Sequence, residues 1–152
     1  PSQSWALPMT TLDSATGDHL LVIVRRMYPH DTMEDAVYAF SVKALDEKAS
    51  KDPGIADLLK NGVADLDQKA GGSWLKLDEA HQVAILASVE HSDFFTMVRG
   101  TTVASLYSNE LAYLHFGYEG ASFPKGGYLH RGFNDLTWLP NPPADASPAP
   151  LS

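Results

Sequence analysis

The chain has 152 residues, enough for one domain with a hydrophobic core and too few for two domains of ordinary size. Apolar residues make up 44% of it and charged residues 20%, which are the proportions of a folded globular protein and not of a disordered chain. Nineteen acidic residues against eleven basic ones give a net charge of −8, which argues against binding nucleic acid or an anionic membrane through the overall field.

Two further classes of feature are missing from the sequence. The longest unbroken aliphatic run extends from Leu20 to Val24 and is far shorter than the roughly 20 residues of a membrane-spanning helix. The chain contains no cysteine, which excludes disulfide frameworks, cysteine zinc sites, thiolate iron–sulfur clusters and a cysteine nucleophile.

The first two predicted helices are separated by Pro29. After Asp18, apolar residues recur at helical spacing until this proline, namely at Leu20, Ile23, Val24 and Met27. The neighbouring pair Arg25-Arg26 is expected to be solvated. Thr32 is predicted to cap the second helix, because acidic residues that favour the helix dipole follow it. The expected buried stripe of this second helix is Met33, Ala36, Val37, Phe40 and Ala44.

Asp52-Pro53 predicts the start of a third helix, because a capping residue is followed by proline at the first helical position. Its expected buried face consists of Ile55, Leu58, Leu59, Val63 and Leu66. Gly71-Gly72 ends the pattern. Asp78 is predicted to open a fourth helix, whose apolar residues are Val83, Ala84, Leu86 and Ala87.

Ser92 or Asp93 is predicted to open a fifth helix, with an inward face made of Phe94, Phe95, Val98, Thr102 and Leu106. Gly100 lies inside this helix, where it costs about 1 kcal/mol relative to alanine. We expect a close approach of another helix at this glycine.

These patterns predict a mainly α fold. A compact bundle of about five helices is followed by an irregular segment rich in glycine and aromatic residues, and then by a proline-rich tail. We assign the helical domain to residues 1–112, a partner-binding segment to residues 113–140 and the tail to residues 141–152, all within one domain overall.

The segment after the helices differs sharply in composition. Residues 113–138 hold seven of the fifteen aromatic residues, and residues 94–152 carry a net charge of only −1. Such a segment either covers the core of its own chain or lies on a partner, since contiguous apolar surface usually marks a contact. Composition alone favours neither interpretation.

Motifs for catalysis are scarce. The six histidines form no HxxxH or HExxH pattern, so surface or capping positions are expected for them instead of a metal site. No nucleophile elbow, Walker loop or dinucleotide fingerprint occurs. Gly126-Gly127 is expected to form a tight turn and not a phosphate site.

A family resemblance rests on the order of several short motifs. These are RMYPHD at 26–31, LDEAHQ at 77–82, FFTMVRG at 94–100, LYSN at 106–109 and FGYEG at 116–120. In this order they resemble the gluconate 2-dehydrogenase subunit 3 family, with GGYLHRGF at 126–133 as a subgroup-like extension. The aromatic and proline-rich C-terminus is longer than the commoner pattern of that family.

The resemblance implies an accessory small subunit that is not itself the catalyst. The partner would be a large flavoprotein of the glucose–methanol–choline (GMC) type, which holds FAD and the substrate base and oxidises a sugar, polyol or related alcohol. A cytochrome c subunit with haem c would take the electrons. The small subunit would support folding, twin-arginine export and stability of the flavoprotein in the periplasm, and a chain starting at Pro1 fits the mature product of that export.

We expect the segment from Gly117 to Trp138 to contact the flavoprotein, with glycines that allow close backbone approach and aromatic or arginine side chains that anchor the contact. The predicted partner-binding residues are Tyr118, Glu119, Gly120, Gly126, Gly127, Tyr128, Arg131, Phe133 and Trp138. No catalytic, cofactor-binding or metal-binding residue is predicted in this chain.

Two other functions remain open at this point. The chain is alternatively a self-contained envelope protein or enzyme that binds a small molecule in a pocket of the helical domain. A third interpretation is an interaction module that uses its proline-rich tail for an unrelated receptor.

Overall fold

The computed structural model describes residues 9–108, 113, 121 and 123–127. As predicted, the fold is mainly helical, and the described part contains no strand. Its elements are α1 Ser14–Met27, α2 Asp35–Lys51, α3 Pro53–Ala70, the 3₁₀ helix η1 Trp74–Lys76, α4 Glu79–Ser88, α5 Asp93–Tyr107 and the 3₁₀ helix η2 Phe123–Lys125. No helix among the described residues is long and apolar enough to cross a membrane.

Contacts divide the chain into a unit Pro1–Tyr118 and a unit Glu119–Ser152. The five α-helices belong to the first unit, and η2 belongs to the second. The predicted segments 113–140 and 141–152 lie almost entirely outside the described residues, so their limits stay predictions.

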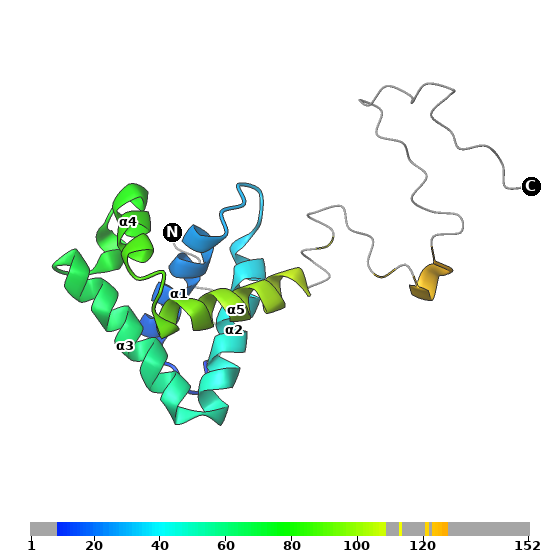
Figure 1. The fold of residues 1–152 in the computed structure, drawn as a ribbon, viewed down its shortest axis with the longest axis horizontal. Coiled ribbons are helices and arrows are strands. Elements are labelled where there is room, and N and C mark those ends of the chain that lie inside the picture. Colours follow the sequence, from blue (N-terminus) through cyan, green and yellow to red (C-terminus); the bar gives the residue numbers. More distant parts are fainter. Residues whose placement is uncertain (1–8, 109–112, 114–120, 122, 128–152) are drawn as a thin grey trace, which may run out of the picture. The chain divides into compact units, whose positions relative to one another are not determined.

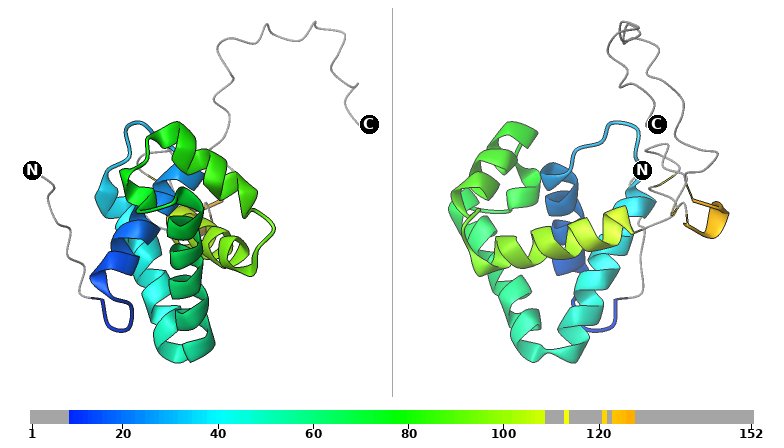
Figure 2. Two further views of the ribbon diagram at one scale, coloured as in Figure 1. Left: turned by 90° about the vertical axis from the view of Figure 1, so that its left-hand side faces the viewer. Right: turned by 45° about the vertical axis from the view of Figure 1, so that its right-hand side comes forward.

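The helical unit is built around α2. A sharp turn at Asp52 joins α2 to α3 so that the two helices form a V, and α5 crosses this V while packing against α1, α2 and α3 (Figures 1 and 2). The interior between these helices is filled mainly by large apolar side chains. The largest fully buried ones are Trp74, Tyr38, Leu20, Ile23, Leu45, Leu59, Leu66 and Leu106.

Helix α1 begins earlier than predicted. Its cap is Asp13, whose carboxylate accepts a hydrogen bond of 2.7 Å from the backbone N–H of Thr16. Asp18, the predicted start, is an exposed residue of the second turn. The expected apolar residues Leu20, Ile23 and Val24 are buried. The sequence pattern missed the first turn because the residue buried there, Thr16, is polar, and the search for periodicity considered only apolar residues.

The predicted buried stripe of α2 is partly wrong. Met33 and Val37 are buried as expected, but Phe40 is 45% exposed. Thr32 lies before the helix, whose N-cap position is Glu34. Because α1, α3 and α5 all pack against α2, its buried face is wide and includes small and polar residues. The buried residues of α2 are Val37, Tyr38, Ala39, Ser41, Val42, Leu45, Asp46 and Ala49.

Helix α3 agrees with the sequence prediction at both ends. The Asp52 carboxylate accepts a hydrogen bond from the backbone N–H of Gly54, and Pro53 is the first helical residue. Gly71 ends the helix with a φ of 67°, in the left-handed region that glycine adopts without strain. Leu59, Val63 and Leu66 of the predicted face are buried, and Ile55 and Leu58 are half-buried.

Helix α4 starts where predicted, and of the apolar residues named for it above only Leu86 is buried. The Asp78 carboxylate caps it by accepting a hydrogen bond of 2.9 Å from the backbone N–H of His81. Val83 is 44% exposed, and Ala84 and Ala87 are exposed as well. The buried residues are Gln82 and Leu86. Gln82 is buried because its amide has several hydrogen-bonding partners, as described below.

Helix α5 is capped by Ser92, whose hydroxyl accepts a hydrogen bond of 3.1 Å from the backbone N–H of Phe95. Its predicted inward face is confirmed, except that Phe95 is only half-buried and Thr101 is also buried. The close approach expected at Gly100 is wrong, since a Cβ built there would meet no atom within 4 Å. The close contact lies instead at Gly62 of α3, where a Cβ would be 2.1 Å from the ring of Phe94.

Candidate functional site

The predicted partner-binding residues fall almost wholly outside the described part of the chain. Gly126 and Gly127 are described, whereas the others are not: Tyr118, Glu119, Gly120, Tyr128, Arg131, Phe133 and Trp138. The role assigned to these seven residues therefore stays a prediction.

Gly126 and Gly127 form the expected tight turn directly after η2. Their φ angles are 87° and 70°, and the backbone N–H of Gly126 donates a hydrogen bond of 3.2 Å to the Phe123 carbonyl. Positive φ explains why this pair is glycine. Phe123, which opens the 3₁₀ turn, is 91% exposed.

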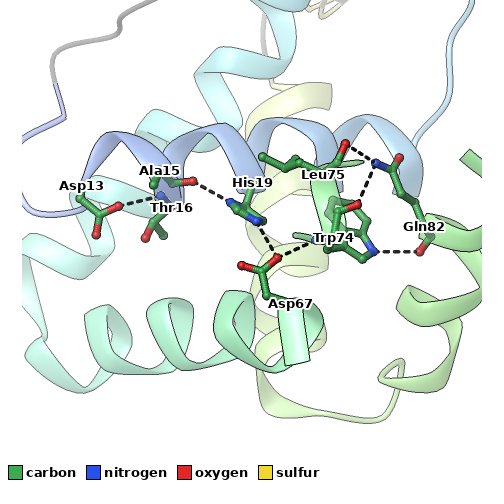
Figure 3. Close-up of polar contacts among 8 residues, drawn as sticks. All are labelled: Asp13, Ala15, Thr16, His19, Asp67, Trp74, Leu75 and Gln82. Carbon is green, nitrogen blue, oxygen red and sulfur yellow. Dashed lines mark hydrogen bonds and ion pairs between the residues drawn. The ribbon is translucent and has the colours of Figure 1, made fainter. Parts of the chain in front are cut away.

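The most elaborate polar site of the helical unit centres on His19 of α1 (Figure 3). The residue is 7% exposed. Its Nδ1 atom lies 2.8 Å from the carbonyl oxygen of Ala15, and its Nε2 atom lies 3.1 Å from Oδ1 of Asp67 on α3. The ring also stacks on Trp74 of η1 at a centroid distance of 6.4 Å. One side chain thus connects α1 to two later elements, α3 and η1.

Both ring nitrogens of His19 face oxygen atoms that accept hydrogen bonds. In a catalytic histidine one nitrogen is oriented by a partner while the other faces the reacting group. Both nitrogens of His19 are used within the fold, so its geometry is that of a clamp between α1 and α3.

The carboxylate of Asp67 serves a second contact. Its Oδ1 atom accepts a hydrogen bond of 2.7 Å from the backbone N–H of Trp74, where the chain turns from α3 into η1. Asp67 therefore fixes both α1 and η1 to α3. The same contact brings Trp74, which is fully buried, against the His19 ring.

Trp74 and Gln82 are joined reciprocally. The indole Nε1–H donates to the Gln82 carbonyl, and the Gln82 amide nitrogen donates to the Trp74 carbonyl, each at 3.3 Å. The side-chain oxygen of Gln82 accepts a hydrogen bond of 2.8 Å from Nε of Arg26 on α1. The buried amide is thereby satisfied, and α4 is attached to both η1 and α1.

The two arginines at the end of α1, which the sequence suggested are solvated, have side chains that are 38% and 23% exposed, and both form ion pairs. Arg26 forms an ion pair of 3.3 Å with Glu79 in addition to its bond with Gln82. Arg25 forms an ion pair with Asp35 and lies 5.6 Å above the centre of the Tyr38 ring. Both arginines occupy the last helical turn, where positive charge favours the helix dipole.

A second clamp fixes the segment before α1 to α2. The carboxylate of Asp46, 3% exposed, accepts four hydrogen bonds. They come from the N–H and hydroxyl of Thr10, both at 2.7 Å, and from the N–H groups of Thr11 at 3.0 Å and Leu12 at 2.8 Å. Burial raises the pKa of Asp46, but the hydrogen bonds outweigh burial and hold the pKa below its ordinary value.

Two of the described histidines match the expectation of surface and capping positions. His81 is exposed and lies 2.7 Å from the capping carboxylate of Asp78, and His91 is exposed beside Glu90. The expectation is wrong for His19, which is buried. Among the described residues, no group of three histidine or acidic side chains lies close enough to hold a metal ion.

The clamp residues were not singled out from the sequence, although a signal existed. His19 directly precedes the apolar stripe of α1, one turn before Ile23, so its position on the buried face was readable from the spacing. Its partner Asp67 was not readable, since it comes from another helix. Comparisons with protein-family models, with curated proteins and with solved structures found no match to this chain.

Proposed function

We propose that this chain is a non-catalytic small subunit of a periplasmic, FAD-dependent dehydrogenase complex that oxidises a sugar, polyol or related alcohol. In this proposal it binds a GMC-type flavoprotein, supports its folding and export, and stabilises it. FAD and the substrate base belong to the flavoprotein, and a cytochrome c subunit with haem c completes the electron path.

The observation that carries the proposal is the contrast between the interior of the helical unit and the surface of α5. The buried His19, Asp46 and Gln82 are committed to contacts that hold helices together. Val103 and Tyr107, one turn apart on α5, are 42% and 45% exposed. They lie near the C-terminal end of α5, a few residues before the aromatic and glycine-rich stretch that begins at residue 113, whose composition is typical of an interface.

The positions of the family-like motifs give further support. The stretch 26–31 covers the end of α1 and the loop after it, and 77–82 covers the start of α4. These two stretches meet through Arg26, which pairs with Glu79 and Gln82. A resemblance in two segments that contact each other is stronger support than one in unrelated surface loops, because their side chains depend on each other.

The proposed mechanism is thermodynamic linkage. A subunit that binds the folded flavoprotein, but not its unfolded chain, shifts the folding equilibrium by mass action. Aromatic side chains such as Phe133 and Trp138 would supply the apolar anchors, and Arg131 would pair with a carboxylate of the partner or stack on one of its aromatic rings. This mechanism requires no reacting group in the small subunit.

The test is co-expression of the tagged chain with its genomic neighbours, followed by affinity purification and a visible spectrum of the eluate. We expect a stoichiometric large subunit with flavin absorption bands. A colourless, monodisperse monomer without a partner would reject the proposal. The small-molecule alternative would then come first.

A further inference from the structure

Helix α5 is attached to the rest of the helical unit in two different ways along its length. The buried residues of its first half are both apolar, namely Phe94 and Val98. Its second half lies beside α2 (Figure 1), and two of its three buried residues are polar, Thr101 and Thr102. The third is Leu106. The apolar attachment of α5 is therefore concentrated in its first half.

The contact of the second half with α2 buries hydroxyl groups that are poorly paired. Thr102 is fully buried, and its Oγ1 atom has no hydrogen-bond partner among the residues that the structure describes. The Thr101 hydroxyl donates to the sulfur of Met97 over 3.8 Å, and a thioether is a weak acceptor. Ser105 donates to the hydroxyl of Ser41, which is fully buried on α2, at 2.8 Å. A buried hydroxyl without a bond weakens the packed state, because its lost hydration is not replaced.

Large apolar side chains near the same contact stay exposed. Phe40, which directly precedes Ser41 on α2, is 45% exposed. On the second half of α5, Val103 and Tyr107 are 42% and 45% exposed. Hydroxyl groups thus lie inside the contact and apolar side chains outside it, which is the reverse of the arrangement that stabilises a helix pair.

Gly100 lies at the junction of the two halves. It is exposed, and a Cβ at this position would meet nothing within 4 Å, so packing does not require a glycine there. Glycine is among the weakest helix formers, because its backbone has more freedom to lose. Helix α5 is therefore least rigid at the point where its apolar attachment ends.

We propose that the end of α5, Thr101–Tyr107, is a detachable unit that swings away from α2 about Gly100. In the open state the buried hydroxyl of Thr102 reaches water, whereas Leu106 loses its burial and keeps the docked state the more populated one. The predicted partner-binding segment follows this unit in sequence, so opening changes the point from which that segment leaves the helical unit. The inference concerns this chain alone and does not depend on the proposed function.

The experiment is native-state amide hydrogen exchange of the full chain, followed for each residue by NMR, which measures the opening of the two halves separately. Thr102→Val replaces the unpaired hydroxyl with a methyl group of similar size, and Gly100→Ala stiffens the junction. Thr96→Val is the matched control, because Thr96 is an exposed threonine in the first half of the same helix. The amides of residues 104–107 report on the second half, and those of residues 97–99 report on the first.

In the wild type we expect the amides of residues 104–107 to exchange faster than those of residues 97–99, after correction for their intrinsic rates. Thr102→Val should slow exchange at 104–107 by about tenfold and leave 97–99 unchanged, because it removes a cost that only the docked state carries. Gly100→Ala should also slow exchange at 104–107. Thr96→Val should change neither half.

Three results would overturn the inference. Unchanged exchange at residues 104–107 in Thr102→Val would mean that only ordinary fraying of the helix end is observed. Equal slowing in both halves would mean that α5 opens as one piece. A lower melting temperature of Thr102→Val would show that the hydroxyl stabilises the docked state. Since all of these measurements are made without a partner, each result leaves the proposed function as it stands.

Discussion

The Nε2 atom of His19 lies 3.1 Å from Oδ1 of Asp67, and through this contact α1 is tied to α3 across 48 positions of sequence. His19 is buried, so loss of Asp67 leaves its Nε2 atom in the interior without a partner, whereas the Asp67 side chain is 37% exposed and keeps the bond from Trp74. The helical unit therefore depends on a polar contact as well as on its apolar core.

Removal of this contact should destabilise the protein. We expect His19→Leu and Asp67→Ala each to lower the free energy of unfolding by about 1–3 kcal/mol, measured by urea denaturation at pH 7. Asp65→Asn is the control, because its pair with Lys69 lies on the helix surface and should contribute less than about 0.5 kcal/mol. Equal stabilities of His19→Leu and the wild type would contradict the clamp.

Asp46 should make the protein sensitive to acid. Because its folded-state pKa is lower than the ordinary 3.8, its stabilising effect is fully present above the unfolded-state pKa and is lost as the pH falls through the folded-state pKa. We expect stability to decline below about pH 4, and Asp46→Asn to be less stable at neutral pH and to lose less on acidification. Hydrogen bonds also lower the pKa values of Asp13 and Asp78. These two carboxylates add to the acid sensitivity of the wild type and of Asp46→Asn alike.

The check is urea denaturation of the wild type and Asp46→Asn at several pH values between 7 and 2.5. If the difference in unfolding free energy between the two proteins were the same at every pH, the assigned role of Asp46 would be wrong. Thr10→Val serves as a second variant, since it removes only the hydroxyl among the four donors.

The two helix glycines should respond to alanine in opposite directions. At Gly62 the new methyl group would displace the Phe94 ring, so we expect a net loss of about 1–3 kcal/mol from overpacking. At Gly100 it meets open space, and we expect a gain of up to about 1 kcal/mol from helix propensity. Thermal melting of both variants tests these opposite changes in stability. A stabilised Gly62→Ala would show that α3 and α5 are not in close contact at Gly62.

The proposed interface predicts that aromatic residues after α5 matter more for assembly than the last residues of the chain. We expect Phe133→Ala and Trp138→Ala each to weaken flavoprotein binding by about 2 kcal/mol, measured by quantitative co-purification or titration. Deletion of residues 141–152 should have a smaller effect. The opposite order would favour the proline-rich tail as the binding element and a different receptor as its partner.

The ends of the helices were largely readable from the sequence, because capping is a local interaction. Asp52-Pro53 with Gly71, Asp78, and Ser92 mark helix ends where they were expected. The start of α1 at Asp13 was missed because its first turn carries no apolar pattern.

The buried faces were less predictable. The sequence pattern placed Phe40 inside, and it is 45% exposed. Hydrophobic periodicity shows that a face is apolar, but the number and position of the helices packed against it determine which residues are covered. Helix α2 touches three others and buries Ser41 and Asp46, whereas α4 buries Gln82 because Trp74 and Arg26 supply hydrogen bonds.

The sequence by itself determined the helical class, the number of helices and most of their caps, since these depend on residues within one turn of each other. Only the tertiary structure decided which polar groups meet: His19 with Asp67, Asp46 with the segment before α1, and Gln82 with Trp74. It also decided that Gly62, and not Gly100, is the glycine required by packing. Such contacts join residues that are far apart along the chain, and their geometry follows from how whole helices pack against one another.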